Sequence, residues 1–139
     1  MSFLFGIHTI PDYQIFWEGQ HFYAMVNLKP ITPGHLLLCS KRRIQRVWEL
    51  LDEELAELHK ASAMIVKELI CDGATLVIQD GPEAGQTIPH LHMHIVPLKG
   101  VQHIDNYERP DRTKEDMASE ARRYAEILGS KDRVSINLA

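Results

Sequence analysis

Three histidines alternate with apolar residues in the run His90-Leu91-His92-Met93-His94-Ile95-Val96. Successive side chains of a β-strand point to opposite faces of a sheet. The alternation therefore predicts a strand over 90–96 that carries three imidazoles on one face and core residues on the other. Imidazole can act as a nucleophile, move a proton or bind a metal at neutral pH, so this face is the candidate functional surface.

The rest of the chain predicts one α+β domain with a mostly antiparallel sheet. Apolar residues at three- and four-residue spacing predict one long helix from Asp52, its cap, to Asp72-Gly73, and a C-terminal helix over Thr113 to Leu128. A short helix is expected at Ile44 to Leu51, and a tail or edge strand after Gly129. Short apolar or alternating runs predict further strands at Phe3 to Ile7, Tyr13 to Trp17, His21 to Asn27, His35 to Cys39 and Ala74 to Gln79.

Length and charge limit the classes of function. The 139 residues suit a single domain, with a core over about 1–99 and a C-terminal loop and helix over 100–139. The net charge of -4 provides no overall basic field that would attract nucleic acid or an acidic membrane. The chain shows no membrane-spanning run and no secretory signal, and Cys39 and Cys71 form no CxxC pair. We expect a cytoplasmic protein, also nuclear if its source is eukaryotic.

Four interpretations compete for the histidine strand. Two neighbouring imidazoles could share a metal ion, but a third is hard to bring in, and the surrounding motif offers no carboxylate or thiolate. The face could instead be merely polar, or it could be a pH-switched binding surface. The fourth interpretation is phosphoryl or nucleotidyl transfer with a histidine nucleophile, in which a nitrogen–phosphorus intermediate splits one displacement into two.

The loop that precedes the histidines favours the fourth interpretation. Asp80 to Thr87 contains two glycines that make backbone N–H groups accessible, together with the Gln86 amide and the Thr87 hydroxyl. Such groups can stabilise the charge that develops on a phosphate. Most loops of this kind are only turns, so the prediction depends on the loop and the histidine strand together.

Several segments give the chain a resemblance to a known family. They are Ser2 to Gly6, Val26 to Pro30, Pro33 to His35, and the run from Gln79 through the loop into the three histidines. On these segments the chain resembles the histidine triad (HIT) family and is most similar to its fragile histidine triad branch, the dinucleoside polyphosphate hydrolases. The resemblance covers about residues 1–99. By this resemblance, Tyr107 would be the counterpart of a tyrosine that the branch carries beyond the active site.

The resemblance implies a HIT-like fold, with a five-stranded antiparallel sheet, one long helix and one C-terminal helix, paired into a homodimer. It also implies cleavage of substrates such as diadenosine triphosphate to AMP plus a nucleotide through a nucleotidyl-histidine intermediate. A divalent cation, Mg²⁺ or Mn²⁺, would arrive on the polyphosphate, with no metal held by the protein. An adenosine phosphoramidate hydrolase of the same family and a slow-turnover nucleotide-binding signalling module are the alternatives.

The resemblance also assigns residues. His92 would be the nucleophile, His94 would contact the phosphate or the bridging oxygen, and His90 and His35 would hold the array in register. The implied substrate-binding residues are His8, Asn27, Gln79, Gly85, Gln86, Thr87, Ile88 and His94.

Overall fold

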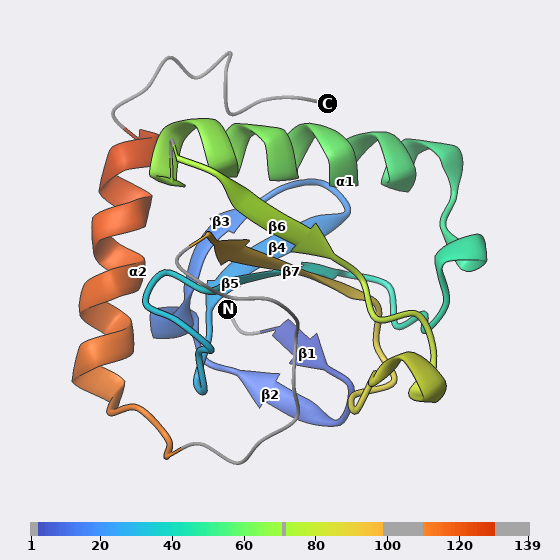
Figure 1. The fold of residues 1–139 in the computed structure, drawn as a ribbon, viewed down its shortest axis with the longest axis horizontal. Helices are drawn as coiled ribbons and strands as arrows, with labels where there is room; N and C mark the ends of the chain where they lie inside the picture. The colour runs from blue at the N-terminus through green and yellow to red at the C-terminus, as the bar shows by residue number, and fades with distance from the viewer. Residues whose placement is uncertain (1–2, 71, 99–109, 130–139) are drawn as a thin grey trace.

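A five-stranded antiparallel sheet forms the centre of the molecule (Figure 1). The structure, a computed structural model, describes residues 3–70, 72–98 and 110–129. Within them the strand order is β3-β4-β5-β7-β6, which brings the histidine strand between two others. The strands are β3 (Ile15–Glu18), β4 (Phe22–Val26), β5 (Leu36–Ser40), β6 (Ala74–Val77) and β7 (His92–Pro97).

Two helices cover one face of this sheet. Helix α1 (Asp52–Ile65) continues into a π-helical turn, η3 (Val66–Ile70), and α2 (Lys114–Gly129) follows near the C-terminus. Apolar residues from both helices pack against Leu91, Met93 and Ile95, the predicted core-facing set of the histidine strand. The predicted α+β class and the two helices are confirmed. Asp52 is the first residue of α1 and not its cap, because Leu51 occupies the cap position.

A two-stranded hairpin lies on the opposite side of the sheet (Figure 1). The prediction of one strand from Phe3 to Ile7 is wrong, because the chain reverses at Gly6 and forms β1 (Phe3–Phe5) and β2 (His8–Ile10). Gly6 has a φ of 64°, a left-handed conformation that glycine adopts without steric cost. The hairpin buries a second apolar cluster against the sheet, consisting of Phe5, Ile10, Tyr23, Met25, Leu37 and Cys39.

Other boundaries differ from the predictions at the ends of elements. The expected helix over Ile44 to Leu51 is reduced to the 3-10 turn η2 (Val47–Glu49), and another 3-10 turn, η1 (Asp12–Gln14), precedes β3. β6 ends at Val77, two residues before Gln79. A further 3-10 turn, η4 (Pro82–Ala84), lies in the glycine-containing loop.

The histidine strand is also shorter than predicted. β7 begins at His92 because Leu91 N–H donates to the Ile44 carbonyl, outside the sheet ladder, and His90 lies in the preceding turn. Tyr107, Cys71 and the predicted tail after Gly129 lie outside the described residues. No helix within the described part of the chain is long and apolar enough to cross a membrane.

Candidate functional site

A cavity of about 640 Å³ lies between the hairpin and the sheet. Its polar end is formed by His92 and His94 of β7, Asn27 at the end of β4, and Thr87 of the loop before β7. Its apolar wall comes from both hairpin strands and from the middle strands of the sheet, through Phe5, Ile10, Met25 and Leu37. The cavity therefore joins a site for polar chemistry to a surface suited to a flat apolar group.

His92 has one committed and one available ring nitrogen. Its Nδ1 lies 2.7 Å from the backbone carbonyl oxygen of His90, so Nδ1 carries the proton and donates it to that oxygen. Nε2 makes no hydrogen bond within the described residues and keeps its lone pair. His92 is 7% exposed, and this burial lowers its pKa from the usual 6.5. The neutral, Nδ1-protonated ring is the form that a nucleophile requires.

A chain of hydrogen bonds sets the tautomer of His94. Ile31 N–H donates to His35 Nδ1 over 3.0 Å, so the proton of His35 is on Nε2. That Nε2 lies 3.0 Å from Nδ1 of His94 and donates to it. Neutral His94 therefore carries its proton on Nε2, an atom that is buried and has no partner in the described residues.

His94 is held in the neutral form. Burial, reinforced by the adjacent rings of His92 and His35, lowers the pKa of His94 to about 3. Its ring centroid lies 4.9 Å from that of His92. A permanently neutral ring with an unused N–H beside the His92 ring is suited to donate a hydrogen bond to a substrate oxygen.

His90 and His35 lie behind the cavity and do not line it. His90 is fully buried: its Nδ1 accepts from Gly6 N–H over 2.9 Å, and its Nε2 donates to the Ser40 carbonyl over 2.7 Å. The first contact ties the hairpin turn to the histidine array, and the second ties the array to β5. With both ring nitrogens engaged, His90 is fixed in position, and the supporting role that the resemblance implies for it stays a prediction.

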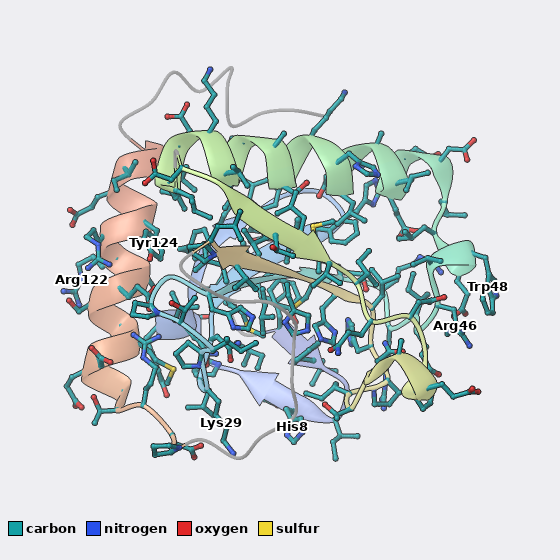
Figure 2. All side chains as sticks on the ribbon, in the orientation of Figure 1. His8, Lys29, Arg46, Trp48, Arg122 and Tyr124 are labelled. Atoms are coloured by element: carbon teal, nitrogen blue, oxygen red, sulfur yellow. The ribbon has the colours of Figure 1, made fainter. Side chains whose placement is uncertain are left out.

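The structure brings six of the predicted site residues together around the cavity. They are His8, Asn27, Thr87, Ile88, His92 and His94. His8 is exposed on β2 (Figure 2). Among the predicted binding residues, Gln79, Gly85 and Gln86 do not line it in this structure.

Gln86 is engaged inside the loop. Its Oε1 accepts from Gly81 N–H over 2.9 Å, and its Nε2 donates to the Gln45 carbonyl over 3.2 Å. The loop is further fixed by Asp80, whose carboxylate accepts from both Arg46 and Val47 N–H. The Gln86 amide thus holds the shape of the loop.

The hydrogen bonds of the loop limit which backbone groups can meet a phosphate. The N–H groups of Ala84, Gly85 and Gln86 all donate to carbonyls within the loop. Thr87 and Ile88 line the cavity, and their N–H groups make no hydrogen bond within the described residues. Of the predicted binding residues Gly85, Gln86, Thr87 and Ile88, the last two therefore have backbone N–H groups available to a phosphate.

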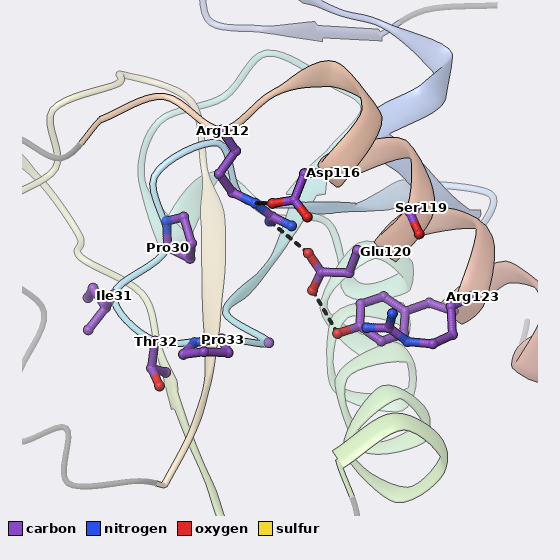
Figure 3. A pocket seen from close by; sticks show the side chains of 11 residues that line it. Pro30, Ile31, Thr32, Pro33, Arg112, Asp116, Ser119, Glu120 and Arg123 are labelled. Carbon is purple, nitrogen blue, oxygen red and sulfur yellow. Dashed lines mark hydrogen bonds and ion pairs between the residues drawn. The ribbon is translucent and has the colours of Figure 1, made fainter.

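Asn27 connects the cavity to the supporting structure. Its Nδ2 lies 3.3 Å from Nδ1 and 3.4 Å from Nε2 of His35, and its Oδ1 accepts from Lys29 N–H. The Asn27 carbonyl accepts from Nη1 of Arg112 over 3.0 Å. Arg112 also pairs with Asp116 and with the buried Glu120 of α2 (Figure 3).

The residues of the apolar wall were not predicted as site residues from the sequence, and neither was Gln14, a polar residue that lines the cavity from η1. The positions of Phe5 and Ile10 depend on the unpredicted hairpin. Within the described residues, no three His, Cys, Asp or Glu side chains gather in a way that could hold a metal ion.

Comparison with known proteins identifies a family and several relatives that this chain resembles in sequence. The model of the HIT domain family matches residues 9–101. Bis(5'-adenosyl)-triphosphatase of Dictyostelium discoideum is 38% identical, over 84% of this chain and 87% of the relative. The nitrilase and fragile histidine triad fusion protein NitFhit of Caenorhabditis elegans is 37% identical over 89% of this chain, but the chain spans only about a third (32%) of that relative.

The solved structures agree with the sequence comparison. The crystal structure of Plasmodium falciparum diadenosine triphosphate hydrolase in complex with cyclomarin A has a TM-score of 0.79 and is 29% identical. The match covers 94% of this chain and 86% of that one.

Proposed function

The chain belongs to the HIT domain family, and we propose that it hydrolyses dinucleoside polyphosphates such as diadenosine triphosphate to AMP and a second nucleotide. The proposal rests above all on His92. This residue lines the cavity beside the neutral ring of His94, and its Nε2 carries no proton. The names of the Dictyostelium relative and the Plasmodium structure support this substrate class.

The first step is attack by Nε2 of His92 on the α-phosphorus. A nitrogen–phosphorus bond forms, the bond from phosphorus to the bridging oxygen breaks, and that oxygen leaves with the electron pair as part of the second nucleotide. The His92 ring becomes positively charged, which strengthens the hydrogen bond from its Nδ1 to the His90 carbonyl. The fixed carbonyl thus stabilises the intermediate as well as the correct tautomer.

His94 assists the departure of the second nucleotide as a hydrogen-bond donor. A pKa of about 3 means that His94 carries no extra proton to give, and a terminal phosphate oxygen is a weak base that leaves as an anion. The Nε2–H of His94 therefore stabilises negative charge on the bridging oxygen or on the α-phosphate. Thr87 and Ile88 N–H stabilise the remaining phosphate oxygens.

Water then completes the reaction. It attacks the phosphorus of the nucleotidyl-histidine, the nitrogen–phosphorus bond breaks, and the bonding pair returns to Nε2, which restores neutral His92. One proton of the water leaves with AMP and the other passes to solvent. Mg²⁺ or Mn²⁺ bound to the substrate polyphosphate would screen its charge.

We also propose that the protein acts as a cytoplasmic homodimer. β6 is an edge strand of the described sheet, and its Leu76 is 43% exposed. Leu98, just beyond the adjacent strand β7, is 54% exposed. An apolar sheet edge of this kind favours pairing with a second copy of the chain.

The decisive experiment is intact-mass detection of an AMP adduct after rapid quenching with diadenosine triphosphate, with peptide mapping to locate it. We expect the adduct on His92 and its loss in His92→Ala, which should still bind the substrate. His59→Ala, an exposed histidine of α1, is the matched control and should retain the adduct and turnover. An adduct elsewhere, or turnover in His92→Ala, would contradict the mechanism. Faster cleavage of an adenosine phosphoramidate would favour the alternative substrate.

A further inference from the structure

The apolar wall of the cavity runs across the sheet, away from the histidines. His94 is paired with Leu37, Leu37 with Met25, and Met25 with Ile15 across the antiparallel register. Neighbouring strands lie about 4.8 Å apart, so Met25 is about 10 Å from His94 along this row. A nucleotide whose α-phosphorus lies at His92 therefore extends its sugar and base over Leu37 and Met25, towards β3.

Gln14 lies at the far end of that row. It is the last residue of η1, immediately before Ile15, and it lines the cavity although it is only 6% exposed. Its Nε2 donates to the Val26 carbonyl over 2.8 Å and lies 3.8 Å from the sulfur of Met25. These contacts place the amide beside Met25, where the row predicts the base.

The hydrogen bond to Val26 fixes which way the amide points. A carbonyl oxygen accepts and cannot donate, so only the nitrogen of the Gln14 amide can face the Val26 carbonyl. The remaining polar atom is Oε1, which makes no hydrogen bond within the described residues. Gln14 therefore offers a ligand an acceptor, and reversing the amide would bring two carbonyl oxygens together in a buried place.

We infer that Gln14 is a specificity-determining residue that accepts a hydrogen bond from the exocyclic 6-amino group of adenine. The inference rests on the proposed function, which places a purine nucleotide in this cavity. A purine with a 6-oxo group presents an acceptor to Oε1, so two lone pairs would face each other with neither satisfied. The side chains of Ile10 and Met117, which line the same cavity, are apolar and offer no N–H or O–H group to the 6-oxo oxygen.

Binding of mononucleotides to the full chain tests this inference without requiring catalysis. We expect calorimetry to show that AMP binds about tenfold more tightly than inosine monophosphate, because the preference corresponds to one buried hydrogen bond. Gln14→Leu should reduce this ratio to about one. Gln20→Leu, which makes the same chemical change at an exposed glutamine of the β3–β4 turn, should retain it.

A ligand-side measurement on the unmodified chain keeps the test valid if Gln14→Leu does not fold. N6,N6-dimethyl-AMP has no N–H at position 6 and should bind about as weakly as inosine monophosphate. Equal binding of AMP and inosine monophosphate would overturn the role of Gln14 and leave the proposed function intact. An unchanged preference for AMP in a folded Gln14→Leu variant would have the same two consequences. Failure of every nucleotide to bind would overturn both.

Discussion

The Nε2 atom of His35 lies 3.0 Å from Nδ1 of His94, although 59 positions separate the two residues in the chain. The same His35 ring accepts a hydrogen bond from Ile31 N–H at Nδ1. The position of a backbone amide in the β4–β5 loop thus decides which nitrogen of His94 carries a proton. His35 reaches the chemistry through His94, so it is a positioning residue.

We expect His35→Leu to lower kcat by about 10- to 100-fold with a smaller change in KM. Without the donor at His35, His94 can carry its proton on Nδ1 and present a lone pair to the negatively charged substrate. The resulting repulsion removes part of the stabilisation that one hydrogen-bond donor gives the transition state, which is worth about 100- to 1,000-fold in kcat when it is lost entirely. Nitrogen-15 NMR should show the Nε2–H tautomer of His94 in the unmodified chain and a mixture in the variant.

His59→Leu serves as the control, because His59 is exposed on α1 and should leave both the tautomer and kcat unchanged. A variant at His35 that retained the Nε2–H tautomer of His94 but lost activity would indicate a different role for His35.

The pH dependence of kcat/KM follows from the burial of His92. The nucleophile must be unprotonated, and burial lowers its pKa below 6.5, so the active form persists at more acidic pH than for an exposed histidine. At pH 6 an ordinary histidine would be about three-quarters protonated, and this protein should retain a larger share of its kcat/KM than the unprotonated quarter of such a histidine would allow. A rate profile from about pH 4 to about pH 8 measures the acid limb. An apparent pKa above 6.5 on that limb would contradict the prediction.

Local sequence patterns could predict the main sheet and the histidine face. The alternation of Met93 and Ile95 with His92 and His94 was sufficient for the part of this face that lies in β7, because side-chain direction in a strand depends only on neighbouring residues. The spacing of apolar residues predicted α1 and α2 for the same reason.

Features that depend on contacts between distant segments could not be predicted in this way. The reversal at Gly6 is stabilised by His90, 84 positions away, and a glycine in the Phe3 to Ile7 run does not by itself specify a turn. The orientation of Gln14 depends on the Val26 carbonyl, and the side chain of Gln86 is taken up by Gly81 and Gln45. An amide in a sequence shows that a donor and an acceptor exist, but only its neighbours show which of them is left for a ligand.

Gly6→Ala should destabilise the fold and lower activity together. Gly6 has a φ of 64°, and a Cβ there would lie 2.9 Å from Cγ2 of Ile88, a residue that lines the cavity. We expect a loss of about 1–2 kcal/mol in the free energy of unfolding, measured by urea denaturation. Activity should fall under native conditions because Gly6 N–H orients His90, whose carbonyl holds His92.

Gly129→Ala provides the comparison for Gly6. A Cβ at Gly129, the last residue of α2, meets no atom within 4 Å, so alanine should leave stability unchanged or slightly raised and activity unchanged. Equal effects of the two substitutions would show that the turn conformation is not the cause.

The pairing of Arg112 with Glu120 supports the cavity from the side of α2 (Figure 3). The two side chains are 2.7 Å apart, and Arg112 also donates to the Asn27 carbonyl. Glu120 accepts a hydrogen bond from the Tyr124 hydroxyl. Burial, the main cause, raises the pKa of Tyr124 to about 12, so this hydroxyl stays protonated. Arg112→Met should cost about 2 kcal/mol of stability, because it leaves the buried Glu120 without a cation.

A double-mutant cycle separates this pairing from simple loss of packing. Arg112→Met combined with Glu120→Gln should cost less than the sum of the two single changes, because the second removes the charge that the first leaves unpaired. Arg122→Met, at an exposed arginine of α2, should leave the free energy of unfolding nearly unchanged. Because Arg112 holds the Asn27 carbonyl at the edge of the cavity, Arg112→Met should also raise KM several-fold. Additive stability effects in the cycle, together with an unchanged KM, would contradict this role of Arg112.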